Sequence, residues 1–492
     1  MRGFLIAVLV LLCLPFAALA QQDDRDYLTA FLEDNLSSAG RKVTVTGFRG
    51  ALSSQAELDS LTIADSEGVW LTLNNVVLDW SRASLLRGVV NVSELTAGEI
   101  IVARTPVSDS DAVVSPEATG FSLPDLPVSV NIDKLSVKRI ELGAAILGQK
   151  IEGSLEASAK LDGGEGEVDL HLLRSDAGPE GELALKASYG NASKDLKIEM
   201  TLAEGADGIA ATLLDLPGKP SLNLTINGAG PLDDFAAKLQ LKTDGKDRLT
   251  GDVTLKGASD GAQMFQVSLD GDVAPLFLPD YAEFFGSKIS LTAEGSRSTL
   301  GRLDLTALDL KTRAVSLTGS AVIAPDGLPE QFQLAGKLSL PDGQPVLLPL
   351  GSAVETRVTS ADLNIGYDAA TRDGWTAVVD LSGLDRADVK LARARIKGSG
   401  RINRRGGEGG AIVAGTLNFD TTGVDVTDPA VAKALGSDMT GRLGFDWQKG
   451  GLGLRIGRLT LVEKGYEIGA SARFGDLQSG FRVKGSVDAR YD

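Results

Sequence analysis

Apolar and polar residues alternate along most of this chain, in short runs that turns separate. Clear runs occur at residues 43–45, 221–226 and 290–292. Successive side chains of a β-strand point to opposite faces, so this alternation places the apolar side chains of each strand on one face. The Gly, Asp, Asn and Pro residues between the runs are typical of tight turns. The pattern therefore predicts a mostly β protein built from a long, repetitive sheet with one apolar face.

The predicted apolar face is mainly aliphatic, because aromatic residues make up only 5% of the chain. A sheet that binds sugars or single-stranded nucleic acid would offer stacking rings. Aliphatic walls suit acyl chains, which need burial and little directional hydrogen bonding. The same alternation also builds the sealed core of a β-sandwich or closed solenoid, so both interpretations remain open. The residues that we expect to line a lipid groove are Leu71, Leu73, Leu222, Leu224, Ile226, Leu291, Leu303 and Leu305.

Size and charge restrict the class of protein further. A chain of 492 residues exceeds the usual size of one compact core. A repetitive sheet avoids this limit because it lengthens without thickening. The net charge of −17 gives no basic surface for nucleic acid, so we expect no nucleic-acid partner.

Few residues are present that could support catalysis. The chain has one cysteine, Cys13, and one histidine, His171, so it lacks the residues for a zinc cluster, a disulfide or a Ser-His-Asp triad. His171 lies in an alternating run and is interpreted as an ordinary strand residue. Residues 257–261 match the G-x-S-x-G pattern, but they join two alternating runs and no histidine follows them, which predicts a hairpin turn. We expect no enzymatic activity and no cofactor.

The first 20 residues have the composition of an export signal. Arg2 precedes an apolar run, and Ala18 and Ala20 form a small-x-small cleavage site before Gln21. The apolar run of about 17 residues is also close to the minimum that can span a bilayer. Residues 1–20 are therefore predicted to be either a cleaved signal peptide or a signal anchor.

The remaining chain is expected to fall into four parts. Residues 21–40 place apolar side chains at helical spacing and predict a short helix that caps the first strand. Residues 41–104 form a first β module, residues 105–127 a polar loop that contains proline, and residues 128–492 a continuing β-groove. Within this last part, residues 275–285 are expected to be helical or looped. Because the sequence stops within or just after a strand, we expect that it is truncated at its C-terminus.

Several segments in a fixed order resemble one known family. They are residues 43–52 (VTVTGFRGAL), 58–71 (LDSLTIADSEGVWL), 76–80 (VVLDW), 85–88 (LLRG), 278–286 (LPDYAEFFG) and 303–306 (LDLT). Together with the preceding helix, they resemble the N-terminal portion of the TamB family, the AsmA-like, bridge-like subunits of the translocation and assembly module. The likeness extends over the chain after the signal and is looser beyond residue 340.

The resemblance implies a taco-like β-sheet groove in the periplasm of a Gram-negative bacterium, attached to or associated with the inner membrane by the N-terminal segment. It implies phospholipid movement between the inner and outer membranes, and a partner in an outer-membrane barrel of the TamA type. Two features depart from the family: residues 18–20 look cleavable, and the family's conserved C-terminal region has no counterpart. An alternative function is a scaffold that helps insert outer-membrane proteins by pairing strands at an open sheet edge.

Overall fold

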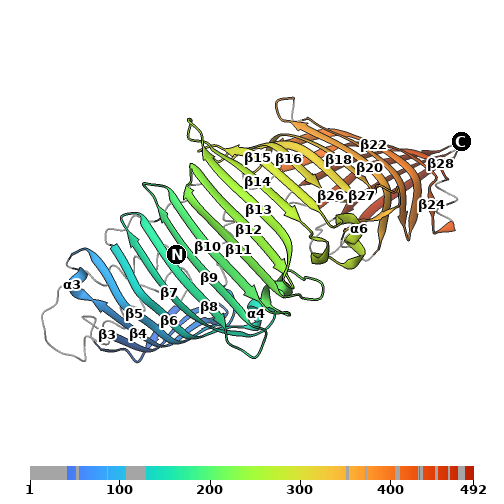
Figure 1. Ribbon diagram of the computed structural model, residues 1–492. Coiled ribbons are helices and arrows are strands. Elements are labelled where there is room, and N and C mark those ends of the chain that lie inside the picture. The colour runs from blue at the N-terminus through green and yellow to red at the C-terminus, as the bar shows by residue number, and fades with distance from the viewer. Residues whose placement is uncertain are drawn as a thin grey trace. The chain divides into compact units, whose positions relative to one another are not determined.

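The structure is a computed structural model of the chain (Figure 1). It describes residues 42–50, 55–85, 87–106, 123, 129–350, 354–371, 374–404, 411–429, 432, 436–448, 453–463, 466–474 and 483–491. The chain forms two compact units, residues 1–247 and residues 248–492.

The first unit is a sheet in which most strands pair with their neighbours in sequence. Its strands are β1 (Lys42–Thr46), β2 (Arg49–Gly50), β3 (Gln55–Asp65), β4 (Gly68–Ser81), β5 (Val89–Val102), β6 (Ser129–Leu142), β7 (Ile151–Asp162), β8 (Glu165–Arg174), β9 (Gly181–Gly190), β10 (Asp195–Glu204), β11 (Leu222–Pro231) and β12 (Asp234–Thr243). Its short helices are α3 (Arg82–Leu85), α4 (Ala144–Leu147) and α5 (Ile209–Leu213). The strands from β3 to β12 lie side by side in chain order (Figure 1).

One pair in this unit is parallel, whereas the others that the structure describes are antiparallel. Strand β5 runs parallel to β6, with Val92 opposite Ile132 and Ala97 opposite Val137. A parallel pair cannot be joined by a tight turn, because the chain must return along the whole length of the strand. The long polar loop expected at residues 105–127 lies within this connection. The parallel direction of β5 and β6 therefore explains why the connection is long.

The second unit is a longer antiparallel sheet. Its strands are β13 (Lys246–Gly257), β14 (Gln263–Gly271), β15 (Ile289–Arg297), β16 (Leu303–Lys311), β17 (Val315–Ile323), β18 (Pro329–Ser339), β19 (Val346–Leu347), β20 (Thr356–Asp368), β21 (Gly374–Arg386), β22 (Val389–Arg404), β23 (Ala411–Thr422), β24 (Asp425–Val426), β25 (Met439–Gln448), β26 (Gly453–Glu463), β27 (Tyr466–Phe474) and β28 (Val483–Tyr491). Its helical turns are η1 (Ala274–Leu276), η2 (Pro279–Tyr281) and α6 (Ala282–Phe285). The helical turns confirm the interruption predicted at residues 275–285.

The two ends of the strands in the second unit differ in their connections. One end carries η1, η2, α6 and β19 between successive strands, and we call it the helix rim. The opposite end carries short turns at residues 258–262 and 298–302, and we call it the hairpin rim. The turn at 258–262 joins β13 to β14, which confirms that the G-x-S-x-G match is a hairpin turn.

The alternation of the sequence is reproduced as two chemically different faces. On β10, for example, Ile198, Met200 and Leu202 are half-buried, while Lys197 and Glu199 between them are exposed. Across neighbouring strands the apolar positions lie directly opposite one another, because the register is set by which face is shielded from water. The prediction of a mostly β protein with a long sheet is confirmed.

Three of the expected segments lie outside the described residues. They are the signal or anchor at 1–20, the capping helix at 21–40 and most of the loop at 105–127. Their predicted structures remain predictions.

Candidate functional site: the apolar face of the sheet

The structure places all eight of the predicted lining residues on described strands. Leu71 and Leu73 lie on β4, Leu222, Leu224 and Ile226 on β11, Leu291 on β15, and Leu303 and Leu305 on β16. All of them are half-buried except Leu222, which is 5% exposed at the start of β11.

Two unbroken rows of apolar side chains cross the first unit from β6 to β12. A row here means residues that lie directly opposite one another on successive strands. One row is Leu135, Ala157, Leu170, Leu185, Met200, Ile226 and Leu239, and the next is Val137, Leu155, Leu172, Leu183, Leu202, Leu224 and Leu241. The predicted residues Leu224 and Ile226 are therefore members of two continuous aliphatic rows.

The exposure of these rows changes along the first unit. On β4 to β6 part of the apolar face is closed, with Val76 at 9%, Ala97 at 5% and Val137 at 2% exposed in one packed cluster. From β7 to β12 every member of the two rows is half-buried. A sealed core of close-packed aliphatic side chains would bring these residues near zero exposure. The face is therefore partly open to solvent over β7–β12.

In the second unit the predicted residues lie on two adjacent strands. Leu291 of β15 is opposite Leu310 of β16, and Leu305 is opposite Gly295. Between these pairs β16 contains a bulge, which moves one extra residue out of register. Because of the bulge, Leu303, Leu305, Leu308 and Leu310 share one face although a strict period of two would divide them.

An aromatic cluster closes part of the apolar face in the second unit, at the hairpin rim. Tyr367 is 1% exposed and Trp375 is 8% exposed, and they pack with the buried Ile402. The Tyr367 ring lies 5.6 Å from that of Phe332, and the Trp375 ring lies 5.9 Å from that of Phe445. The low aromatic content of the chain led us to expect a face with few rings. That expectation is wrong here, because residues distant in sequence are brought into one row.

Glycine makes this cluster possible. The indole of Trp375 lies against the backbone of β22 and β23, where a Cβ atom at Gly398, Gly400 or Gly415 would collide with the ring. The indole N–H donates a hydrogen bond to the carbonyl of Ala414 at 3.2 Å, so its polar atom is satisfied within the cluster. In the sequence, this cluster is signalled by the glycine content of β22 and β23. Glycine content alone does not show which aromatic side chain lies against these strands, because that depends on the strand register.

A second cluster closes the face at the helix rim of the same unit. Ala314, Leu340 and Val346 are at most 3% exposed, and Phe284 of α6 packs on them together with Val315 and Leu338. Backbone N–H groups of Arg313 and Ala314 donate to the carbonyls of Phe285 and Phe284 at 3.1 Å and hold α6 in place.

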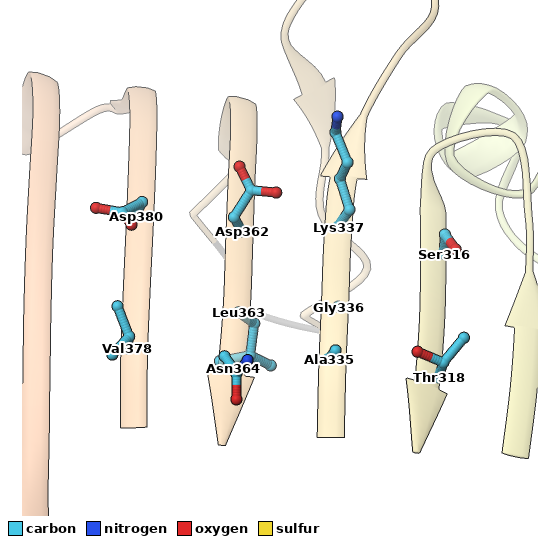
Figure 2. Close-up of a pocket in the computed structure, with 10 residues that line it drawn as sticks. All are labelled: Ser316, Thr318, Ala335, Gly336, Lys337, Asp362, Leu363, Asn364, Val378 and Asp380. Atoms are coloured by element: carbon cyan, nitrogen blue, oxygen red, sulfur yellow. The ribbon is translucent and has the colours of Figure 1, made fainter. Parts of the chain in front are cut away.

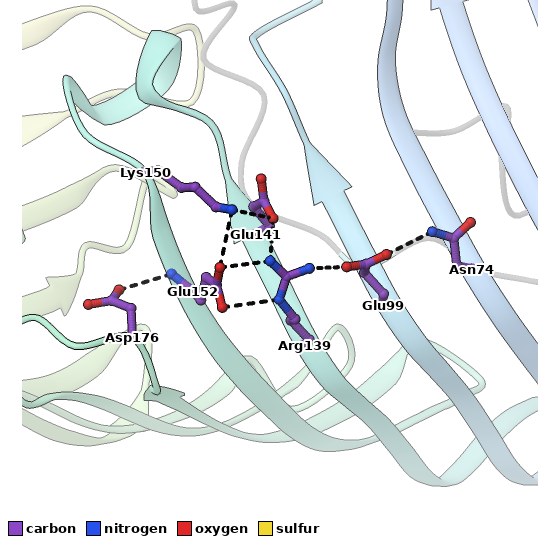
Figure 3. Close-up of polar contacts among 7 residues, drawn as sticks. All are labelled: Asn74, Glu99, Arg139, Glu141, Lys150, Glu152 and Asp176. Carbon is purple, nitrogen blue, oxygen red and sulfur yellow. Dashed lines mark hydrogen bonds and ion pairs between the residues drawn. The ribbon is translucent and has the colours of Figure 1, made fainter.

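The polar face carries a network of charged side chains across β5, β6 and β7 in the first unit (Figure 3). Arg139 pairs with Glu99, with Glu141 at 2.5 Å and with Glu152 at 2.7 Å. Lys150 lies 3.2 Å from Glu152. The hydrogen bonds from Arg139 and Lys150 lower the pKa of Glu152 to about 2. The cross-strand ion pairs link neighbouring strands on the side of the sheet that faces water.

The polar face of the second unit also contains a hollow of about 390 Å³ (Figure 2). On its floor Lys337 of β18 lies opposite Asp362 of β20, and Asp362 lies opposite Asp380 of β21. Ala335 leaves space on this face because its side chain is a single methyl group. The hollow is open, and Lys337 and Asp362 are exposed, so it lacks the shielding from water that strengthens electrostatic catalysis.

Other kinds of site find no support in the described residues. Within the described ranges, His, Cys, Asp and Glu side chains nowhere gather in a group of three or more that could hold a metal ion. The single histidine, His171 of β8, pairs across the strand with Glu182 at 2.6 Å. None of the helices that the structure describes combines the length and apolar character needed to cross a membrane.

No protein-family model, curated protein or solved structure matches this chain.

Proposed function

We propose that the protein carries phospholipid along the apolar face of its sheet, as a periplasmic bridge between the inner and outer membranes. The observation that supports the proposal most strongly is the set of half-buried aliphatic rows across β7–β12. An aliphatic surface that is continuous over several strands and only partly shielded is suited to a ligand that is itself a hydrocarbon chain. The resemblance to the TamB family supports the membrane setting and the TamA-type partner.

We expect the binding free energy of an acyl chain to be favourable along the apolar rows and similar from one strand to the next. Full burial contributes about 0.8 kcal/mol per CH2 group, so an acyl chain covered on one side retains roughly half of that per methylene. The rows change little in chemistry from Leu170 to Leu185 and Met200. A chain that shifts by one strand loses and gains similar contacts, which permits movement along the sheet. No catalytic residue is needed.

Photochemical cross-linking with phospholipids tests this function. The purified full chain is mixed with vesicles whose phospholipids carry a diazirine in the acyl chains, and adducts are located by mass spectrometry of peptides. We expect adducts at Leu224 and Ile226 of the apolar face and few at Thr225, which lies between them on the opposite face. Adducts spread equally over both faces, or absent from β11, would refute acyl-chain binding there.

The same experiment separates the alternative function. A scaffold for outer-membrane proteins would pair its backbone with client strands at a sheet edge and would not need acyl chains on the apolar rows. If removal of this protein from cells impairs outer-membrane protein assembly, and the cross-linking gives no lipid adducts on the apolar rows, the scaffold is favoured.

A further inference from the structure

Leu123, a residue of the connection between β5 and β6, contacts the apolar face of the first unit at Gly166 of β8. A Cβ atom placed on Gly166 would lie 2.6 Å from Cδ1 of Leu123 and 3.6 Å from Cδ1 of Leu161 on β7. The side chain of Leu123 is half-buried there. Leu123 therefore fills the space that the missing side chain of Gly166 leaves above the sheet.

Gly166 belongs to the same face as the aliphatic rows. Residues separated by an even number of positions along a strand share a face, so Gly166 lies on the face of Leu170. Gly166 is directly opposite Leu161 of β7 and Tyr189 of β9, and Tyr189 is directly opposite Leu196 of β10. Leu123 thus interrupts an apolar row that otherwise crosses β7 to β10.

The side chain of Asn191, in the turn between β9 and β10, binds the backbone of Leu123 with both of its polar atoms. The backbone N–H of Leu123 donates to Oδ1 of Asn191 at 2.8 Å, and Nδ2 of Asn191 donates to the carbonyl of Leu123 at 2.8 Å. Paired residues of an antiparallel ladder exchange their N–H and C=O groups in the same way. The amide of Asn191 therefore takes the place of a partner residue on a strand.

Gly164, in the turn between β7 and β8, gives the Asn191 side chain its position. Its φ of +79° is in the left-handed region that favours glycine, and a Cβ atom there would lie 2.7 Å from Nδ2 of Asn191. The backbone N–H of Asn191 also donates to the carbonyl of Gly164 at 2.9 Å. Gly164 admits the amide that binds Leu123, and Gly166 admits the leucine side chain. We call Gly164, Gly166 and Asn191 the Leu123 site.

The contacts of Leu123 suit an occupant that can be exchanged. Its side chain is half-buried, whereas Val137 in the packed cluster of the same unit is 2% exposed. Each of its hydrogen bonds to Asn191 has a modest net strength, because water offers the same groups other partners. A hydrocarbon chain that lies on Leu161 would make the same kind of apolar contact at Gly166 that Leu123 makes.

We propose that the Leu123 site is a hydrocarbon-binding site for which Leu123 and the acyl chain of a phospholipid compete. This inference rests on the proposed function and adds to it a contact by which the chain itself limits the path of the lipid. With Leu123 in place, an acyl chain cannot cross β8 at Gly166. When Leu123 leaves, an acyl chain reaches Leu161 and Tyr189, and water satisfies the amide of Asn191.

Photochemical cross-linking tests the competition. The full chain is mixed with phosphatidylglycerol vesicles whose acyl chains carry a diazirine. Adducts on Leu161 and Tyr189 report the Leu123 site, and adducts on Leu224 and Ile226 report the continuous rows. We expect Asn191→Ala to raise the ratio of site adducts to row adducts about tenfold, because two hydrogen bonds that hold Leu123 are lost.

The matched control is Ser193→Ala, which changes an exposed residue of the same turn. We expect this variant to give the same adduct ratio as the unmodified protein. Equal ratios in Asn191→Ala and the unmodified protein, with row adducts present in both, would overturn the competition and leave the proposed function standing. If Leu224 and Ile226 give no adducts in any of the proteins, the proposed function itself fails.

A second measurement follows the departure of Leu123 directly. The thiol introduced by Leu123→Cys is labelled with a maleimide, and peptide mass spectrometry separates it from the natural Cys13. We expect labelling to be about tenfold faster when Asn191→Ala is added, and faster with phosphatidylglycerol vesicles than without them. Labelling that Asn191→Ala accelerates but vesicles leave unchanged would show that lipid does not displace Leu123, and would overturn the proposal.

Discussion

Replacing Leu291 by aspartate distinguishes an open apolar face from a sealed core. Leu291 is half-buried on β15, and its neighbour Thr292 is exposed on the polar face. Full burial of a leucine side chain contributes about 1.5–3 kcal/mol, so a half-buried one contributes about 1–1.5 kcal/mol. On an open face the new carboxylate remains hydrated, and Leu291→Asp should lower the free energy of unfolding by about 1–1.5 kcal/mol more than Thr292→Asp.

The control Thr292→Asp introduces the same charge and the same unfavourable strand propensity of aspartate. The difference between the two losses of unfolding free energy therefore reports the burial of Leu291. The contrasting variant is Val358→Asp, because Val358 is 1% exposed in the same unit. An unpaired carboxylate at such a site costs several kcal/mol, at least about 4.

The assay is urea unfolding of the four proteins, followed by circular dichroism and by protease resistance. Leu291→Asp should remain folded and protease-resistant, with a midpoint close to that of Thr292→Asp, and should lose its lipid adducts. If Leu291→Asp is destabilised as strongly as Val358→Asp, the face is a sealed core and the open-groove interpretation is falsified.

Three further predictions concern the aromatic cluster, the charged network and export. Trp375→Ala should lower the free energy of unfolding by about 3–5 kcal/mol, measured in urea, because the indole is 8% exposed; a loss below about 1 kcal/mol would contradict its packing role. The pKa of Glu152 is lowered from 4.5 to about 2, so its stabilising contribution is present above pH 4.5 and lost as the pH falls toward 2. Urea midpoints of Glu152→Gln and the unmodified protein should therefore differ at pH 6 and converge near pH 2; a constant difference would be inconsistent with the lowered pKa. Residues 1–40 fused to alkaline phosphatase should give an active exported enzyme, and N-terminal sequencing that begins at Gln21 would indicate cleavage, whereas an intact Met1 would indicate an anchor.

Local alternation in the sequence was enough to predict the strands and most of the apolar face. Leu222, Leu224 and Ile226 alternate with polar residues in a single run, and the structure places them on one face of β11. The period of two arises within each strand, so it can be recognised without knowing which strands pair with one another. The helical interruption near Pro279 was also predictable, because proline cannot continue a strand ladder.

The closed parts of the face were not predictable in this way. Phe332, Tyr367 and Trp375 form one row only because three strands pair in a particular register. That register depends on contacts between residues far apart in the sequence. The bulge in β16 does leave a local mark, because the spacing of its leucines changes from two residues to three between Leu305 and Leu308, but the mark does not show which strand pairs there. Sequence reasoning therefore found the aliphatic rows and missed the aromatic and helix-rim clusters that border them.

The most direct test of acyl-chain binding is mass spectrometry of the lipids that co-purify with the full chain. We expect phospholipid in the unmodified protein and in Thr292→Asp, and a large loss of it from a folded variant that combines Leu291→Asp with Leu305→Asp. Both leucines are half-buried on the same face of adjacent strands, so two carboxylates there would meet any chain that occupies β15 and β16. Equal phospholipid content in the double variant and the unmodified protein, or none in either, would contradict lipid carriage on this face.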